Sequence, residues 1–393
     1  MKSAIRIGGL GPLSSPGLFW AGRDLQDGMT LAVQHLNAAG EIAGKSIALH
    51  FEDTRGRTTA GIAAVEKLRN EGVDAFAGEY HSFVAIAFLD RIQQSGLPFV
   101  CASCTLDSIT ERRLSRVFRL APPQSYGWRV YADFLAGEHL RHVVALEEET
   151  QYWNRGSKVI ELRLKELGIR FTRFSVAPGT ADAHWTTQRL QSIASQTDRP
   201  DMLLLLLSDE GAVRRALEKA ASFGLQPPSC FFGDPAGRTG FPGWWQTLQV
   251  VSAEVPFLSY MRWGGLTQIG RQMVQEFEKH YGRQPTFVAL EGYDSVVALA
   301  RAFAKAENTD PERVCDALRY LHVEGTRGTI KFSTEQKGVV HQQWKWPPAL
   351  VMTYRRIPQQ FSEAEPLWDS LTGSVSETVH LRTPPQSFSF QRG

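Results

Sequence analysis

Cysteine, net charge and long apolar runs are all scarce in this chain. Only 4 of its 393 residues are cysteines, and the C-x-x-C at Cys101 and Cys104 lacks the second pair or the histidines that a zinc site needs. The 43 Lys+Arg and 41 Asp+Glu residues leave a formal net charge of +2, without the basic stripe of a nucleic-acid binder. The longest purely aliphatic run, Met202 to Leu207, is far too short to span a bilayer. We therefore expect a soluble globular protein with no metal centre and no nucleic-acid partner.

The signatures of common enzyme families are missing as well. The sequence contains no G-x-x-x-x-G-K-[ST] phosphate loop and no G-x-S-x-G nucleophile elbow. Gly9 and Gly11 follow a first strand pattern, but the dinucleotide fingerprint needs a third glycine where Ser14 stands. We interpret this segment as a loop lining a cleft, and the run Glu147–Glu149 as a solvated loop at a strand end. No cofactor and no catalytic constellation is expected.

What the chain does contain is a regular alternation of strand and helix patterns. Short apolar runs alternate with amphipathic segments in the order βαβαβαβ up to about residue 120, and a second series begins after Pro122-Pro123. Short connections between such units imply parallel sheets with helices on both faces. The sequence therefore predicts an α/β fold of two Rossmann-like lobes. We interpret Cys101 and Cys104 as small buried residues at a strand end and in the loop after it.

Polar loops follow two neighbouring strands of the first lobe. The segment Gly78 to Ser82 places His81 and the Ser82 hydroxyl at a predicted helix start, where free N–H groups favour a carboxylate. Ordinary capping of the helix by Ser82 is the alternative interpretation. Cys104 and Thr105 follow the next strand, and ligands of open α/β sheets bind beyond the carboxyl ends of strands. The two loops together form a candidate ligand site.

The second lobe offers a matching set of residues after its own strands. Trp153 can stack on a ligand, and Asp209 or Asp234 can pair with a cation. Ser208 precedes Asp209 in the same loop. For each of these residues alone, a helix cap or a half-buried aromatic ring is the competing interpretation.

The order of these motifs resembles the type I periplasmic binding proteins, specifically the branched-chain amino acid (Leu/Ile/Val) binding family of ABC importers. The resemblance runs from about Ile5 to Lys345. The segments that carry it are Ile7–Ser14, Gly28–Val33, Leu36–Gly40, Glu52-Asp53, Gly78–Ser82, Gly96–Val100, Pro178–Asp182, Pro200-Asp201 and Gly292–Val296.

The resemblance implies roles for particular residues. In this family a serine at the helix start, here Ser82, and the loop that contains Cys104 and Thr105 hold the ligand carboxylate. The family's second-lobe tyrosine is replaced by Trp153, and the acid that pairs with a ligand ammonium falls nearest to Asp234. With Trp20 also available, an aromatic or larger ligand fits as well as an aliphatic amino acid.

The resemblance also implies an architecture in which three hinge crossings join the lobes around a ligand cleft. The crossings are expected near residues 120–122, 251–255 and 330–333. The chain loses its periodicity after residue 357, and 341–345 with 350–354 suits a hairpin. The implied lobes are residues 1–120 with 254–330 and 121–253 with 331–357, followed by an extended tail at 358–393.

The expected function is therefore non-enzymatic binding of a small amino acid or related carboxylate or amide for an ABC importer permease. A ligand-sensing regulator on the same fold is the alternative, and an enzyme on a Rossmann-like scaffold is a third class. The amino terminus runs straight into a strand pattern with no leader signature. A periplasmic location thus requires a signal peptide that is absent from this sequence, whereas a cytosolic location does not.

Overall fold

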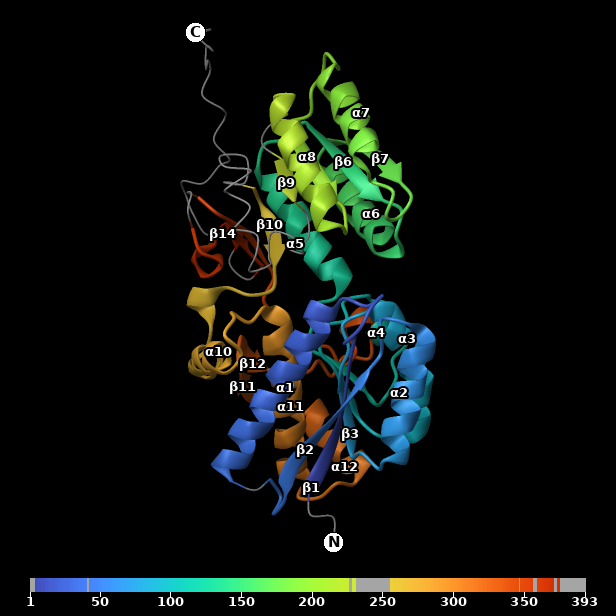
Figure 1. Cartoon of the computed structure of the whole chain (residues 1–393), viewed down its shortest axis with the longest axis vertical. Helices are drawn as coiled ribbons and strands as arrows, with labels where there is room; N and C mark the ends of the chain where they lie inside the picture. The colour runs from blue at the N-terminus through green and yellow to red at the C-terminus, as the bar shows by residue number, and fades with distance from the viewer. Residues whose placement is uncertain are drawn as a thin grey trace. The chain divides into compact units, whose positions relative to one another are not determined.

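The computed structural model divides the chain into two compact units, each with its own sheet (Figure 1). Unit 1 comprises residues 1–124 and 264–348, and unit 2 comprises 125–263 and 349–393, so the chain passes between them three times. The structure describes residues 4–40, 42–225, 228–230, 255–345, 347–355, 359–370 and 373–374.

Unit 1 is built on a five-stranded parallel sheet in the order β2-β1-β3-β4-β5. Helices α1 and α11 cover one face of this sheet and α2 and α3 the other (Figure 1). The predicted α/β alternation is confirmed. The elements are β1 (Ala4–Gly11), α1 (Phe19–Ala39), β2 (Ser46–Asp53), α2 (Thr58–Asn70), β3 (Ala75–Gly78), α3 (Ser82–Ser95), β4 (Phe99–Cys101), α4 (Ser108–Glu111), β5 (Val117–Arg119), α10 (Gln268–Tyr281), α11 (Phe287–Ala306), α12 (Pro311–Arg319), β11 (Val323–Gly325) and β12 (Gly328–Ile330).

Close packing of α1 against α11 depends on a residue without a side chain. A Cβ atom added to Gly28 in α1 would lie 2.1 Å from the carbonyl oxygen of Ala289 in α11. Real Cβ atoms do not approach backbone oxygens so closely, so only glycine allows this contact. The contact fixes α11 beneath the strands whose loops are described below.

Unit 2 carries an eight-stranded sheet in the order β15-β14-β13-β10-β9-β8-β6-β7. Strands β7, β6, β8, β9 and β10 are parallel neighbours, whereas β13, β14 and β15 continue the sheet in antiparallel fashion. The wholly apolar strand β8 is buried between two neighbours, as its sequence predicts. The elements are α5 (Gln124–Gly137), β6 (His142–Glu148), α6 (Gln151–Glu166), β7 (Arg170–Val176), α7 (Ala183–Ala194), β8 (Met202–Leu206), α8 (Glu210–Ser222), β9 (Pro228–Cys230), β10 (Phe257–Ser259), β13 (Leu350–Thr353), β14 (Glu365–Asp369) and β15 (Gly373–Ser374).

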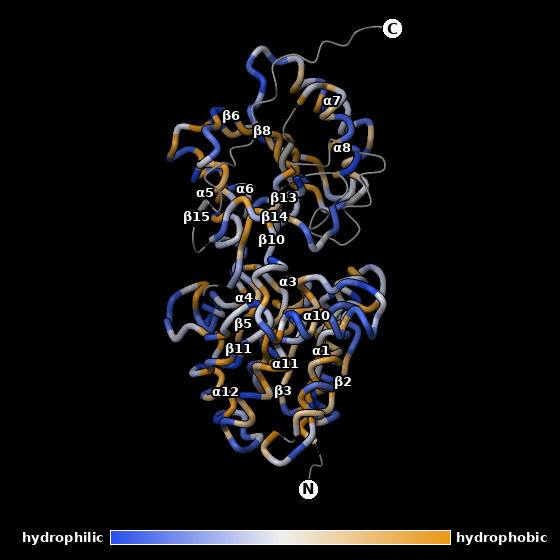
Figure 2. Tube along the Cα trace, turned by 90° about the vertical axis from the view of Figure 1, so that its left-hand side faces the viewer, coloured by the Kyte–Doolittle hydropathy of each residue, from blue (hydrophilic) through white to orange (hydrophobic). Residues whose placement is uncertain are grey.

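Apolar side chains gather inside each unit. Figure 2 shows the hydrophobic colour concentrated in the interior of both units and the hydrophilic colour on outer helix faces and loops. In unit 1, Phe76, Phe88 and Phe99 are fully buried in one cluster under α2 and α3. This rigid interior holds the strand ends that carry the candidate site.

The carboxyl-terminal part of the chain differs from the sequence-based expectation. The predicted hairpin of 341–345 with 350–354 is wrong, because β13 pairs with β10 and β14 instead. Within the predicted extended tail, the strands β14 and β15 belong to the sheet of unit 2. Leu367 of β14 is buried there.

The boundary between the units also differs from the predicted one. Residues 331–348 belong to unit 1, although the prediction assigned 331–357 to the second lobe. Two bridges explain this placement, because Phe332 pairs with Trp344 and Arg119 pairs with Gln343. These backbone contacts tie the segment to the end of β5.

Candidate functional site

Two loops of unit 1 leave the same edge of the sheet. Strands β3 and β4 end together, with Gly78 paired to Cys101. The loops that follow are joined by backbone hydrogen bonds, from Ala102 N to Gly78 O (2.9 Å) and from Ser103 N to Glu79 O (3.1 Å). They lie beside the point where the strand order reverses between β1 and β3, which is where open α/β sheets bind ligands.

Ser82 connects the two loops through its side chain. Helix α3 begins at Ser82 with His81 as its N-cap, so the predicted capping role of Ser82 is wrong by one residue. Its Oγ accepts hydrogen bonds from the backbone N–H of Thr105 (3.1 Å) and of Leu106 (3.2 Å). Two accepted bonds use both lone pairs of the hydroxyl oxygen, so only the proton is left to interact. Ser82 therefore presents a donor, and no described residue accepts it.

The loop from residue 102 to 105 presents one further hydroxyl. Thr105 is 8% exposed, and among the described residues its Oγ1 has no hydrogen-bond partner. Cys104 is fully buried, and burial raises the pKa of its thiol, so the side chain is an inert part of the interior. Both Cys101 and Cys104 are free and buried, which confirms their interpretation as packing residues.

Glu79 is a buried acid that the sequence analysis missed. It adopts a left-handed backbone conformation (φ 66°), and its Oε1 accepts from the N–H groups of Tyr80 and His81, each at 2.9 Å. Two of the N–H groups expected to be free at this helix start are thus already occupied by the chain's own carboxyl. Complete burial raises the pKa of Glu79 to about 7. No local sequence signal distinguishes this glutamate from an exposed one.

Replacing Glu79 with glutamine is expected to change how stability depends on pH. The folded-state pKa of about 7 lies above the ordinary value of 4.5, so the carboxyl stabilises the fold most at low pH, and this contribution is lost as the pH rises from 4.5 to 7. The shift corresponds to about 3 kcal/mol. Glu79→Gln keeps a hydrogen-bond acceptor but does not titrate. Its free energy of unfolding, relative to that of the wild type, should therefore rise by about 2–3 kcal/mol between pH 5 and pH 8.

Urea unfolding at both pH values measures this change, and Glu66→Gln on the outer face of α2 is the control. Glu66 forms only partly exposed ion pairs with Arg69 and Arg91, so its replacement should leave the pH dependence unaltered. If the free energies of unfolding of Glu79→Gln and the wild type differ by the same amount at pH 5 and at pH 8, the pKa of Glu79 is not raised.

Aromatic side chains border the donor groups of unit 1. Trp20 is half-buried, and its ring packs edge-on against Tyr80 with ring centroids 5.5 Å apart. His81 Nε2 accepts a hydrogen bond from Leu18 N (3.1 Å), and burial lowers the pKa of His81 to about 4. His81 is therefore neutral at physiological pH and anchors the loop before α1. The predicted residues Trp20, His81, Ser82 and Thr105 all belong to this one region of unit 1.

In unit 2 the structure brings two of the predicted residues together. Trp153 is 3% exposed, and its Nε1 donates to Ser208 Oγ at 2.9 Å. Its ring also packs edge-on against Trp128, with centroids 5.8 Å apart. Asp209 is exposed and caps α8 by accepting from Ala212 N (2.7 Å). Asp234 lies outside the described residues.

The interpretation of Glu147–Glu149 as a solvated loop is wrong for Glu147 and Glu148, whereas Glu149 follows the strand and is exposed. Glu147 and Glu148 lie within the strand and are 0% and 2% exposed. Glu147 accepts from Ser157 Oγ (3.1 Å), and burial raises its pKa. Glu148 accepts from the N–H of Ser208 at 3.0 Å. The Glu148 carboxyl therefore holds the loop that carries Ser208.

Other kinds of site were searched for in the described ranges. Within them, no three His, Cys, Asp or Glu side chains are grouped so as to hold a metal ion. The helices of the same ranges include none with the length and apolar character needed to cross a membrane.

The family is decided by comparison with known proteins. A family model described as periplasmic binding protein matches residues 4–345. The chain belongs to this family. The Leu/Ile/Val-binding protein homolog 7 of Brucella melitensis is 23% identical over 390 residues, covering 90% of this chain and 94% of the relative. The leucine-, isoleucine-, valine-, threonine- and alanine-binding protein of Pseudomonas aeruginosa is 22% identical over 343 residues, covering 85% of this chain and 86% of the relative.

Solved structures share the fold of this periplasmic binding protein. The solute-binding protein of an ABC transporter from R. palustris, in complex with benzoate, superimposes with a TM-score of 0.77 at 18% identity, covering 96% of this chain and 99% of that one. The branched-chain amino acid binding protein LivJ from Streptococcus pneumoniae, in complex with isoleucine, gives a TM-score of 0.74 at 19% identity, covering 92% and 99%. The predicted resemblance to the branched-chain amino acid group and the predicted two-lobed α/β fold are confirmed.

Proposed function

We propose that this periplasmic binding protein binds a small solute that carries a carboxylate and delivers it to an ABC importer. The observation that carries the proposal is the Ser82 hydroxyl, whose oxygen already accepts two N–H bonds and whose proton is left to donate. The Thr105 hydroxyl belongs to the same pair of loops. The family consists of solute-binding proteins rather than enzymes, which supports transport over the alternative of a sensor.

The groups of unit 1 described above are hydrogen-bond donors. The end of the ligand that contacts them should therefore carry an acceptor. The first N–H groups of a helix have no partner within the helix, and those of Ser82 and Phe83 have none among the described residues. Together with the helix dipole they favour negative charge. The Glu79 carboxyl of these loops is fully buried and already accepts from the N–H groups of Tyr80 and His81, so it is not offered to a ligand ammonium.

The chemical class of the ligand is proposed from the same groups and from the relatives. Solved relatives of this fold hold benzoate and isoleucine, and both ligands carry a carboxylate. Trp20 and Tyr80 provide aromatic edges beside the donors, which suits either an aromatic acid or an apolar amino-acid side chain. For an amino acid, Asp234 is the proposed partner of the ammonium group.

Transport requires that binding be converted into a signal. We expect the two units to be the two lobes and a ligand touching both to stabilise their closed arrangement, because a ligand shifts a conformational equilibrium only through its differential affinity for the two states. An ABC permease is the proposed recipient. The family is extracytoplasmic, and the periplasm is the proposed location.

A thermal-shift screen tests the proposal. Benzoate, L-leucine, L-isoleucine and L-phenylalanine are added to the purified protein, with benzamide and L-leucinamide as uncharged-end controls. An acid present at 100 times its Kd should stabilise the fold by about 2.7 kcal/mol, which raises Tm by several degrees, and should be recovered chemically unchanged. A screen in which no acid raises Tm, or in which amides are preferred to acids, contradicts the proposed carboxylate ligand.

A further inference from the structure

Arg119 is a buried cation directly behind the candidate site. It ends β5, and its side chain is fully buried. Its Nη1 donates to the carbonyl oxygens of Thr105 (3.2 Å) and Leu106 (2.6 Å), and its Nη2 donates to Thr110 Oγ1 (2.9 Å). Its Nε donates to the Gln343 side chain. All of these acceptors are neutral, so the hydrogen bonds hold the guanidinium in place without cancelling its charge.

No carboxylate lies within ion-pair distance of Arg119 in the described part of the chain. Burial lowers the pKa of Arg119 to about 10, although Cys101, Asp107, Cys104 and Glu111 favour its charged form through space. The group is therefore still charged at neutral pH. A buried charge without a counter-ion is unfavourable for folding, so its presence at this position needs a compensating interaction.

The peptide between residues 105 and 106 connects Arg119 to Ser82. Its carbonyl oxygen, on Thr105, accepts from Arg119, and its N–H, on Leu106, donates to Ser82 Oγ at 3.2 Å. A positive charge at the carbonyl end polarises such a chain of hydrogen bonds and strengthens each donor along it. The last donor of the chain is the Ser82 hydroxyl.

Asp107 and Glu111 act on Arg119 only through space, and the other charged groups bonded to these loops do not contact it. The Glu79 carboxyl titrates with a pKa of about 7 and is therefore only partly ionised at neutral pH. Glu291, which accepts from Ser103 Oγ, faces the guanidinium of Arg327 at 3.1 Å. Among the described groups bonded to the two loops, Arg119 is thus a cation that contacts no anionic side chain, unlike Arg327.

We propose that Arg119 is a positioning residue that makes the site prefer an anionic carboxylate to its neutral carboxamide, acting through the 105–106 peptide and the Ser82 hydroxyl. The inference rests on the proposed function. The solute's carboxylate then supplies the missing counter-charge, and a carboxamide of the same shape does not.

The test compares the Kd of each acid with that of its amide, for benzoate against benzamide and L-leucine against L-leucinamide. The acid-to-amide preference is the ratio of the amide Kd to the acid Kd. Arg119→Lys keeps the positive charge and should preserve this ratio within about threefold. Arg119→Gln removes the charge and should reduce the ratio about 10- to 100-fold. A purely structural role would weaken the acid and the amide equally. Isothermal titration calorimetry measures all four ligands on each folded variant.

Thr110→Asp provides a second route if Arg119→Gln does not fold. A carboxylate at the position that already accepts from Arg119 Nη2 gives the guanidinium an internal counter-ion, so Tm should be maintained while the acid-to-amide preference falls at least tenfold. Thr110→Ser keeps the hydroxyl and is the matched control.

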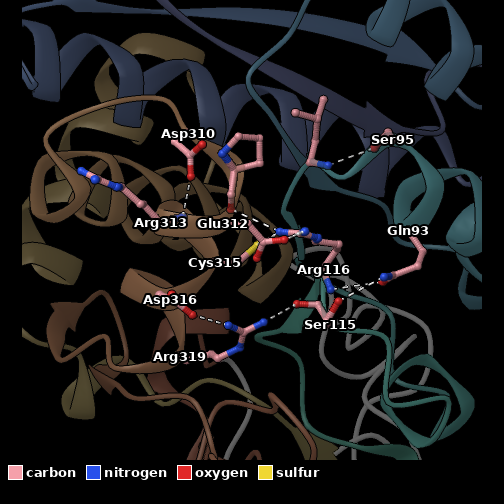
Figure 3. A network of polar contacts seen from close by, with 12 residues as sticks. Gln93, Ser95, Ser115, Arg116, Asp310, Glu312, Arg313, Cys315, Asp316 and Arg319 are labelled. Atoms are coloured by element: carbon pink, nitrogen blue, oxygen red, sulfur yellow. Dashed lines mark hydrogen bonds and ion pairs between the residues drawn. The ribbon is translucent and has the colours of Figure 1, made fainter.

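Arg116→Gln controls for loss of an arginine from the same segment. Arg116 lies three residues before Arg119 and forms an ion pair with Glu312, and its Nη1 contacts Cys315 Sγ at 3.4 Å (Figure 3). Its replacement should leave the preference unchanged. An unchanged preference in both Arg119→Gln and Thr110→Asp, with acid still bound by the wild type, overturns the inference and leaves the proposed function intact. A wild type that binds neither acid overturns both.

Discussion

Replacing Arg327 with methionine is expected to lower the free energy of unfolding by about 3–5 kcal/mol, the usual cost of breaking a buried ion pair from one side. Arg327 and Glu291 have side chains that are 1% and 0% exposed and lie 3.1 Å apart. The substitution keeps the apolar volume near the Trp344 ring, over which the guanidinium lies at 5.2 Å, but leaves Glu291 as a buried acid without its cation. Burial raises the pKa of Glu291 to about 7, so urea denaturation at pH 8, where most of this carboxyl is ionised in the wild type, measures the loss.

A matched surface pair and a compensating substitution make this result specific. Arg91 lies 3.7 Å from Glu66, with side chains 53% and 33% exposed, so Arg91→Met should cost less than about 1 kcal/mol. Adding Glu291→Gln to Arg327→Met removes the orphaned charge and should recover much of the lost stability. If Arg327→Met costs no more than Arg91→Met, the ion pair contributes nothing and the interpretation of the buried network is wrong.

The substitution Ser82→Ala is expected to weaken the affinity for a carboxylate ligand by about 1–3 kcal/mol. The substitution removes the donor to the ligand and also leaves the N–H groups of Thr105 and Leu106 without their acceptor. Isothermal titration calorimetry with the acid that gives the largest Tm increase measures the change in Kd.

Ser95→Ala at the other end of the same helix is the control for Ser82→Ala. Ser95 Oγ donates to the carbonyl of Ile92 at the carboxyl end of α3. Removing this hydroxyl therefore affects the end of the helix but neither of the loops that follow β3 and β4. Its Kd should match that of the wild type. A Ser82→Ala variant that binds the acid as tightly as the wild type removes Ser82 from the site.

The sequence predicted most helices and strands because the spacing of apolar residues within one segment determines which of the two forms. The alternating strand and helix patterns predicted up to about residue 120 and again after Pro122-Pro123 are present as β1 to β5 and β6 to β9 with the helices between them. Parallel strands also made it possible to predict that the loops with Ser82 and Thr105 would meet, and a hydrogen bond now joins them. Repeated strand–helix units sufficed for the fold class.

The errors arise where a partner distant in sequence decides the outcome. Glu147 and Glu148 are charged residues at a strand end, and contacts such as those of Glu147 with Ser157 and Arg173 and of Glu148 with Ser208 compensate for their burial. Arg119 similarly ends a strand pattern, and its burial depends on Gln343, which lies 224 positions later. The sequence alone does not reveal which polar group will find such a partner.

The small shift at the start of α3 had a chemical consequence. With Ser82 inside the helix rather than capping it, the hydroxyl is directed to the neighbouring loop instead of its own helix. Helix ends are the least certain part of any pattern-based assignment because local capping competes with tertiary contacts. At this position the tertiary contact determines the donor of the candidate site.

Small-angle X-ray scattering, with and without a saturating concentration of the acid that most raises Tm, tests most directly whether two units close around a solute. The radius of gyration is expected to fall when the acid is added and to stay unchanged with the corresponding amide. A scattering profile that does not change although calorimetry shows the acid to be bound would contradict ligand-induced closure.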